Sequence, residues 1–221
     1  MKENKKIGIY IPGRLKSERL PNKLILPLGD SCLWEIACKK LNALPEKYNK
    51  YVLCCDDALI EIASNYENLQ IIRRDEQTAE VDGPLTFIFK ELNQVNDTHL
   101  MFLNPCLSVL REETILGALE YFENSNKEYG TSVVKYKNWL WTEDKTHLTP
   151  IDYATLSTKS IPVHYEAAHC FHIFNKKMFF ETGKMLNQDL ELIEIPKAEL
   201  IDIDDLTDYE YAKYLHRNKK N

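Results

Sequence analysis

The sequence predicts an α/β fold in which a mostly parallel sheet lies between two layers of helices. Strand-like and helix-like segments alternate from the start of the chain, which is typical of parallel strands joined by right-handed crossovers. Residues 7–11 carry β-branched side chains at alternate positions, Ile7, Ile9 and Ile11, as a central strand covered on both faces does. We expect residues 1–221 to form a single domain, because 221 residues are enough to bury one full core.

The first half of the chain contains two more strands and two helices. An apolar stripe predicts a helix over residues 32–44, and a proline ends it. Residues 51–55 form an apolar run typical of a second buried strand. We expect Asp56 and Asp57 to cap the next helix, because carboxylates accept hydrogen bonds from the free amides of a first turn. Residues 69–72 predict a third strand.

The second half continues the alternation. Residues 83–84, Gly-Pro, open a helical pattern with apolar residues at 87, 88, 92 and 95. The remaining expected elements are strands at 100–103, 129–136, 166–174 and 200–203, and helices at 111–124 and after 205. Between residues 137 and 166 no helical period is visible, and Trp139 and Trp141 belong either to the core or to an exposed apolar surface that seeks a partner.

Composition excludes several classes of protein. Hydrophobic residues make up 44% of the chain and charged residues 28%, as in ordinary globular proteins. A net charge of -6 argues against a general affinity for nucleic acid, which needs an excess of cations on one face. No apolar run approaches the roughly 20 residues of a membrane span, and residues 1–6 lack the apolar run that a signal peptide requires. We therefore expect a cytoplasmic protein with no nucleic acid or membrane partner.

The six cysteines are expected to be reduced core thiols. No pair has the Cys-x-x-Cys spacing of a zinc or redox site. Four lie scattered among candidate core positions and two, Cys54 and Cys55, lie inside an apolar run. A nucleophilic cysteine is the alternative, although no histidine stands at a recognisable spacing from any of them.

A cationic loop follows the first strand. Residues 12–23 hold four cations and a central hydroxyl, contributed by Arg14, Lys16, Arg19, Lys23 and Ser17. The loop lies past the carboxyl end of the strand, where open α/β sheets bind their ligands. This arrangement predicts a site for a polyanion such as a triphosphate, and the alternative is an ordinary solvated surface loop.

A pair of carboxylates near the C-terminus is the second strong signal. If residues 200–203 form a strand, Asp202 and Asp204 lie on one face while Ile201 and Ile203 enter the core. Two adjacent carboxylates repel unless a cation separates them, and Mg²⁺ favours carboxylates together with phosphate oxygens and water. The alternative is that these acids cap the helix that follows.

The order of these residues resembles the sugar cytidylyltransferases, the enzymes that make CMP-activated acidic sugars such as CMP-acylneuraminate and CMP-3-deoxy-manno-octulosonate. Residues 11–23 match the family's Ile-Pro-Ala-Arg-x-x-Ser-x-Arg-Leu-Pro-x-Lys signature, with Gly13 in place of Ala and Leu15-Lys16 in place of a Gly pair. Residues 201–212 match its Ile-Asp-Ile-Asp-x-x-x-Asp-x-x-x-Ala ending.

Three further segments resemble the family more loosely. Residues 73–82 resemble Arg-Pro-x-x-Leu-Ala-x-Asp, with Arg74 as the matching arginine and Asp82 one position late. Residues 103–109 resemble a Leu-Gln-Pro-x-x-Pro-Leu segment, with Asn104 in place of Gln and Ser108 in place of the second Pro. Residues 166–174 resemble a strand that begins Glu-Asn-Gly. On such a strand His169 and His172 face opposite sides and do not form a metal pair.

The resemblance implies a Rossmann-like nucleotide-diphospho-sugar transferase fold and a Mg²⁺-dependent transfer of CMP from CTP to an acidic 2-keto sugar, with release of pyrophosphate. It implies that nucleotide is bound by Arg14, Ser17, Arg19, Lys23 and Arg74. Arg14 and Lys23 are the expected catalytic residues, which stabilise charge on the phosphates. The acceptor meets Asn104, the metal meets Asp202 and Asp204, and an insertion at 137–166 forms a homodimer. The alternatives are another nucleotide or acceptor, and a degenerate member that binds nucleotide without turnover.

Overall fold

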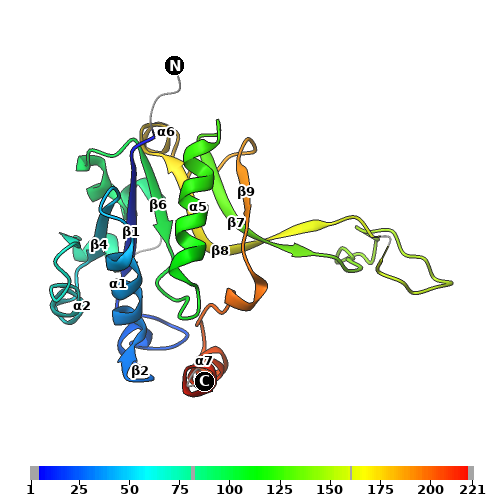
Figure 1. The fold of residues 1–221 in the computed structure, drawn as a ribbon, viewed down its shortest axis with the longest axis horizontal. Helices are drawn as coiled ribbons and strands as arrows, with labels where there is room; N and C mark the ends of the chain where they lie inside the picture. Colours follow the sequence, from blue (N-terminus) through cyan, green and yellow to red (C-terminus); the bar gives the residue numbers. More distant parts are fainter. Residues whose placement is uncertain (1–4, 81–82, 160, 219–221) are drawn as a thin grey trace.

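A computed structural model describes residues 5–80, 83–159 and 161–218, and within these its centre is a seven-stranded sheet with the order β5-β4-β1-β6-β8-β7-β9 (Figure 1). The strands are β1 (Ile7–Gly13), β4 (Asn49–Cys54), β5 (Gln70–Arg73), β6 (His99–Leu103), β7 (Tyr129–Tyr136), β8 (His164–Asn175) and β9 (Glu191–Glu194). A separate small hairpin pairs β2 (Pro27–Leu28) with β3 (Ser31–Cys32).

The sheet is mixed but mostly parallel. β1 lies between β4 and β6 and is parallel to both, and β5 is parallel to β4. β9 is parallel to β7, whereas β8 is antiparallel to both of its neighbours. The α/β fold class predicted from the alternation of elements is therefore confirmed.

Helices cover both faces of the sheet, which gives three layers. The β1 residues Ile7, Ile9 and Ile11 pack in one core cluster with side chains from α1 (Leu33–Ala43), α2 (Asp57–Ala63), α5 (Glu112–Asn124) and α7 (Leu206–Asn218). On the other face, Tyr10 packs in a second cluster with side chains from η2 (Lys90–Gln94) and α6 (Lys176–Thr182), against which part of α4 (Leu85–Ile88) packs. β1 is thus the central strand that its alternating isoleucines predict.

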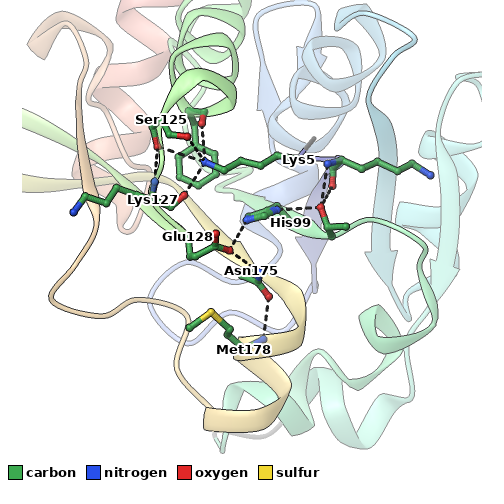
Figure 2. Close-up of polar contacts among 10 residues, drawn as sticks. Lys5, His99, Ser125, Lys127, Glu128, Asn175 and Met178 are labelled. Atoms are coloured by element: carbon green, nitrogen blue, oxygen red, sulfur yellow. Dashed lines mark hydrogen bonds and ion pairs between the residues drawn. The ribbon is translucent and has the colours of Figure 1, made fainter. Parts of the chain in front are cut away.

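A polar network holds the amino ends of β1 and β6 (Figure 2). The Nζ atom of Lys5 donates to three backbone carbonyls at the end of α5, those of Phe122, Ser125 and Lys127. The Oε2 atom of Glu128 accepts from Asn175 Nδ2 at 2.6 Å and lies 3.0 Å from His99 Nε2. These contacts satisfy helix-end and side-chain groups at the edge of the sheet opposite to the predicted site. This network is therefore separate from the predicted ligand-binding site, which lies at the carboxyl ends of the strands.

The helix expected after Pro84 is interrupted. α4 ends at Ile88, and a 3₁₀ helix, η2, begins at Lys90. In a continuous α-helix the carbonyl of Ile88 would accept from the amide of Leu92. It accepts instead from the guanidinium of Arg74 at 2.8 Å, while the amide of Leu92 bonds to Phe89. The buried guanidinium of Arg74 thus occupies the carbonyl oxygen of Ile88, which a longer α4 would need as a hydrogen-bond acceptor.

The strand expected at residues 200–203 is not formed. This segment follows a short 3₁₀ helix, η3 (Lys197–Glu199), and pairs only through an isolated bridge between Asp202 and Leu107. β9, which pairs with β7, forms this edge of the sheet. β9, α6 and a short helix α3 (Glu76–Glu80) are elements that the sequence analysis did not predict.

The prediction that His169 and His172 face opposite sides of a strand is wrong. Pairing with β7 shifts between Thr131, which lies opposite His172, and Val133, which lies opposite Ala167. His169 lies in the resulting bulge with φ of 51°. A bulge breaks the two-residue alternation, and the two imidazole rings lie 5.7 Å apart between centroids. Both side chains therefore face the same cavity.

Between β7 and β8, residues 137–159 and 161–163 project, with the outer ends of those strands, away from the rest of the sheet (Figure 1). Apart from an isolated bridge between Trp141 and His147, the described residues here are irregular, as predicted. Six apolar side chains between 47% and 69% exposed lie on or beside this arm: Trp141, Leu148, Tyr153, Leu156, Val163 and Tyr165. That residues 137–166 form a dimer contact stays a prediction.

Candidate active site

The basic loop after β1 lines a cavity of about 400 Å³ at the carboxyl edge of the sheet, which we call the basic cavity. Its walls include four of the predicted nucleotide-binding residues, Arg14, Ser17, Arg19 and Lys23. The rest of the lining is Pro12, Glu18 and Leu24 together with Pro105 and Cys106, which follow β6. The carboxyl ends of two neighbouring parallel strands therefore open into one cavity, as the topology of an open α/β sheet favours.

Asp56 was expected to cap α2, but its side chain fixes the basic loop instead. It stands at the N-cap position, but its side chain makes no capping hydrogen bond. Its Oδ2 atom accepts from the backbone amide of Leu15 at 3.2 Å. The loop has no strand beside it to satisfy that amide, so the carboxylate at the end of β4 serves instead.

Lys23 joins the basic loop to the C-terminal carboxylates. Its Nζ atom lies 3.0 Å from Oδ1 of Asp204 and donates to the carbonyl of Ile203 at 2.9 Å. Arg19 contacts the same Asp204 oxygen at 2.9 Å. Partial burial would raise the pKa of Asp204, but the hydrogen bond and charge of Lys23, together with Arg19, hold it below the ordinary value. Asp204 is therefore an anion held between two cations.

Asp202 lies in a different environment. Its Oδ2 atom accepts from Asn104 Nδ2 at 2.9 Å, whereas its Oδ1 atom is buried and has no hydrogen-bond partner among the described residues. Burial, and then the neighbouring charge of Asp204, raise the pKa of Asp202. A buried oxygen that is left without a donor costs free energy, so this side chain has the capacity to accept a cation.

Other acids cap the helix that follows. The Oδ1 atom of Asp205 accepts from the amides of Thr207 and Asp208, at 2.7 and 3.1 Å. The side chain of Asp208 accepts in return from the amides of Asp204 and Asp205. These contacts cap the first turn of α7. The alternative that Asp202 and Asp204 serve as helix caps is therefore wrong.

Asn104 lies where the sequence predicted, just past the end of β6, but all of its side-chain atoms already have partners. Besides the bond to Asp202, its Nδ2 atom donates to the carbonyl of His169, and its Oδ1 atom accepts from the amide of Cys106. Asn104 thus ties Asp202 to the bulge in β8. Its role as the residue that binds the acceptor stays a proposal.

Arg74 is only 6% exposed, in contrast to the loop arginines. Its Nη2 atom donates to the carbonyls of Thr78 and Ile88, at 2.6 and 2.8 Å, and its guanidinium lies 5.5 Å from the ring centroid of Phe89. These contacts fix the segment that follows β5. The family-like Asp82 lies outside the described residues.

Two further cavities continue from the basic one. The middle cavity, about 240 Å³, shares Pro12 and Arg14 with the basic cavity and also contacts Arg74. The apolar cavity, about 670 Å³, shares Leu85 and Phe89 with the middle one. The rest of its lining is Phe102, Asn104, His169, His172, Gly183, Lys184, Met185 and Leu186. The three cavities therefore form a row along the carboxyl edge of the sheet.

The sequence analysis missed most of the apolar cavity. Residues 183–186 follow the unpredicted α6 and match no motif, and His169 joins His172 at the cavity because of the bulge in β8. Cys106 is the buried core thiol that was expected, and it also borders the basic cavity. Burial raises the pKa of Cys106 to about 11, so it is a neutral thiol near pH 7 rather than a nucleophile.

The donor set fits a hard divalent cation. Asp202 and Asp204 supply carboxylate oxygens beside the cations of the basic loop, and Asp202 Oδ1 is buried without a partner among the described residues. In the part of the chain that the structure describes, no cluster of three or more His, Cys, Asp or Glu side chains offers a complete metal site. Two carboxylates completed by phosphate oxygens and water match the coordination that Mg²⁺ adopts beside substrate phosphates.

Gly13 is required by the packing beneath the loop. A Cβ atom at this position would lie 2.6 Å from Cη2 of Trp34. Trp34 is fully buried, and its Nε1 atom donates to the carbonyl of Leu59 at 2.9 Å, so the indole has no room to withdraw. The large side chain of Trp34 in α1 therefore explains why glycine replaces the alanine of the family signature at position 13.

Comparisons with known proteins agree with this geometry. The chain is 23% identical over 223 residues to a pseudaminic acid cytidylyltransferase of Campylobacter jejuni subsp. jejuni, and the match covers 94% of each chain. A solved structure of CMP:2-keto-3-deoxy-manno-octonic acid synthetase complexed with CTP superimposes with a TM-score of 0.68 at 11% identity, covering 97% of this chain and 99% of that one.

A cytidylyltransferase from Leptospira borgpetersenii serovar Hardjo-bovis superimposes with a TM-score of 0.60 at 17% identity, covering 95% of this chain and 85% of that one. At such identities the solved structures support the fold. In the described part of the chain, no helix is long and apolar enough to cross a membrane. The family model described as cytidylyltransferase matches residues 8–220, nearly the whole chain, so the protein belongs to the cytidylyltransferase family.

Proposed function

We propose that this protein transfers CMP from CTP to an acidic 2-keto sugar and releases pyrophosphate. The observation that carries the proposal is the junction of the basic loop with the carboxylate pair, made by the contact between Lys23 and Asp204. An acidic acceptor is supported by the relatives, whose names refer to pseudaminic acid and to 2-keto-3-deoxy-manno-octonic acid.

The reaction is a displacement at the α-phosphorus of CTP. The anomeric hydroxyl oxygen of the sugar forms a bond to this phosphorus, the bond to the bridging oxygen of pyrophosphate breaks, and the hydroxyl proton leaves to solvent or to a phosphate oxygen. Negative charge builds up on the departing pyrophosphate. Arg14 and Lys23 in the basic cavity are placed to offset that charge, with Ser17 and Arg19 as further phosphate ligands.

We propose Mg²⁺ as the divalent cation, held by Asp202 and Asp204. When bound, it supplies positive charge that neutralises phosphate oxygens. The protein's own contribution is to hold Asp204 beside Lys23 and to hold Asp202 through Asn104. We assign Arg74 to the part of the three-cavity row that binds the nucleotide, because Arg74 lines the middle cavity together with Arg14.

The test is an assay of pyrophosphate release with CTP, Mg²⁺ and a panel of acidic 2-keto sugars, with ATP, GTP and UTP as matched alternatives. We expect release with CTP and at least one of these sugars, and little with the other nucleotides. Turnover with a different nucleotide, or with a neutral acceptor alone, would replace this function by another nucleotidyltransferase reaction. CTP binding without release of pyrophosphate would favour a member that only binds nucleotide.

We also propose a homodimer that forms through the arm at residues 137–166. The exposed apolar side chains of this arm, among them Trp141 and Leu148, are more surface of that kind than a projecting segment keeps in water. A second copy is the partner we favour, because the resemblance to the sugar cytidylyltransferases implies a homodimer through this segment.

A further inference from the structure

Residues 200–204, which carry the carboxylate pair, lie outside the sheet, between η3 and α7 (Figure 1). Their strand-like pairing with the described residues is one isolated bridge, between Asp202 and Leu107. A functional site needs its side chains held in a fixed geometry, and an irregular segment supplies this less well than a helix or strand does. The place of Asp202 must therefore be fixed by contacts at the ends of this segment.

One end of the segment is held by the residues that follow β6. The Nδ2 atom of Asn104 donates to Oδ2 of Asp202 at 2.9 Å. The amide of Ile203 donates to the carbonyl of Cys106 at 3.1 Å. These contacts fix the carboxylate end of the segment, and the end that begins at residue 199 needs an anchor of its own.

Glu199 supplies that anchor. It is only 4% exposed, although it carries a carboxylate. Its Oε1 atom accepts from Nε of Arg111 at 2.6 Å and lies 2.5 Å from Nη2, and its Oε2 atom accepts from the backbone amide of Arg111 at 2.9 Å. Burial would raise the pKa of Glu199, but the hydrogen bonds of Arg111 and Thr114 hold it below the ordinary value. Glu199 is therefore an anion with both oxygens engaged.

The anchor is built on α5, a helix of 13 residues. Arg111 is the N-cap residue of this helix, and Glu199, 88 positions away in the sequence, places a negative charge there. The helix dipole favours an anion at this end. α5 buries Ile115, Leu119 and Phe122 in the core. Glu199 thus ties the start of the irregular segment to an element that is itself fixed by packing.

We propose that Glu199 is a positioning residue for the carboxylate pair: with Arg111 it fixes the start of residues 200–204 and so holds Asp202 in place for the divalent cation. The inference rests on the proposed function. It goes beyond that function by adding a residue that lines none of the three cavities. A misplacement of about 1 Å can cost about a hundredfold in rate, so loss of the anchor should be felt at the site.

The alternative is that the ion pair only stabilises the fold. Removing one partner of a buried pair lowers stability in either case, so the melting temperature alone does not separate the two roles. Turnover and the response to Mg²⁺, measured well below the melting temperature, do separate them.

The first variant is Glu199→Gln, which keeps the shape of the side chain and removes its charge. We expect kcat for pyrophosphate release to fall about tenfold or more, because Asp202 is no longer held in place. The half-saturating concentration of Mg²⁺ should rise, while KM for CTP at saturating Mg²⁺ should change little, since the basic loop is untouched. A lower melting temperature with unchanged kcat and unchanged Mg²⁺ response would overturn the inference and leave the proposed function standing.

Arg111 tests the same contact from a side chain that is 63% exposed, so folding is less at risk. Arg111→Met removes the charge and should reproduce the loss of kcat, whereas Arg111→Lys keeps the charge and should recover part of it. Glu123→Gln is the matched control, because Glu123 also lies in α5 and pairs with Lys47 at 3.0 Å. It should keep the wild-type kcat and Mg²⁺ response.

A second readout does not depend on turnover. The melting temperature of the CTP-bound protein is compared in Mg²⁺ and in EDTA, because a cation that binds the folded state raises it. We expect a clear rise in the wild type and in Glu123→Gln, and a much smaller rise in Glu199→Gln and Arg111→Met. The same rise in all four proteins would overturn the inference. A wild type that shows the rise but releases no pyrophosphate with any acidic 2-keto sugar would overturn the proposed function instead.

Discussion

The Nζ atom of Lys23 lies 3.0 Å from Oδ1 of Asp204, although the two residues are 181 positions apart in the sequence. Burial would lower the pKa of Lys23, but its contacts with Cys106 and Asp204 raise it, so the side chain stays cationic. The contact brings the two strongest sequence signals into one site.

The basic loop should hold CTP through Arg14. Replacing Arg14 with Ala removes a charge-assisted contact worth about 1.5 to 3 kcal/mol, so the dissociation constant for CTP should rise about tenfold or more. Isothermal titration calorimetry measures this dissociation constant. Lys16→Ala is the matched control, since Lys16 lies in the same loop but is not among the residues that line the basic cavity. An unchanged affinity in Arg14→Ala would exclude the loop as the triphosphate site.

The stability of the metal-free protein should depend on pH through Asp202. Its pKa in the folded state is raised, by burial first, so the unfolded chain loses this proton at a lower pH than the native protein does. Native stability from this group is therefore present at low pH and is lost as pH rises through the folded-state pKa.

In EDTA, the melting temperature of Asp202→Asn should consequently gain on that of the wild type as pH rises from about 4 to about 7. Added Mg²⁺ with CTP should stabilise the wild type more at the higher pH and should stabilise Asp202→Asn much less. Equal stabilisation of the two proteins at pH 7 would argue against a metal at Asp202.

Gly13 should tolerate alanine only if Trp34 becomes smaller. The added Cβ meets Cη2 of Trp34 at 2.6 Å, and such overpacking costs about 1 to 3 kcal/mol. In a Trp34→Phe background the same substitution should cost clearly less, which a double-mutant cycle by urea unfolding measures. Gly117→Ala is the control, because no heavy atom outside the helix backbone lies within 4 Å of a Cβ at that position in α5. Additive effects of Gly13→Ala and Trp34→Phe would contradict the packing argument.

The arm should hold two copies together. Replacing both Trp141 and Leu148 with Asp places charges on side chains that are 50% and 60% exposed in the single chain, and we expect light scattering to shift from a dimer to a monomer. Tyr211→Asp, at an exposed position on α7, should leave the dimer intact. A wild-type monomer at micromolar concentration, or a double variant that remains dimeric, would contradict this proposal.

The sequence predicted the parts of the fold that depend on local pattern. Alternating isoleucines identify β1, and an apolar stripe identifies α1, because each pattern matches the period of its element. The early end of α4 was not predictable in this way, since it depends on Arg74 reaching the carbonyl of Ile88 from another segment.

In the candidate site, too, some residues were visible as local sequence patterns and others depend on contacts between distant segments. The cations of the basic loop and the pair Asp202 and Asp204 were visible as motifs, although the predicted strand that was to carry the pair is absent. The place of His169 beside His172 in the apolar cavity depends on a bulge in β8, which no local pattern indicates. Asp205 and Asp208 cap α7, which leaves Asp202 and Asp204 to the site.

The most direct test of this account is pyrophosphate release by Asp204→Asn beside Asp205→Asn, each with saturating CTP, Mg²⁺ and an accepted sugar. Asn keeps the shape of Asp and caps helices about as well, so both variants should melt close to the wild type. We predict that Asp204→Asn loses nearly all turnover, because it loses the charge beside Lys23, and that Asp205→Asn keeps it. Turnover near the wild-type rate in Asp204→Asn would contradict a role for the carboxylate pair in the reaction.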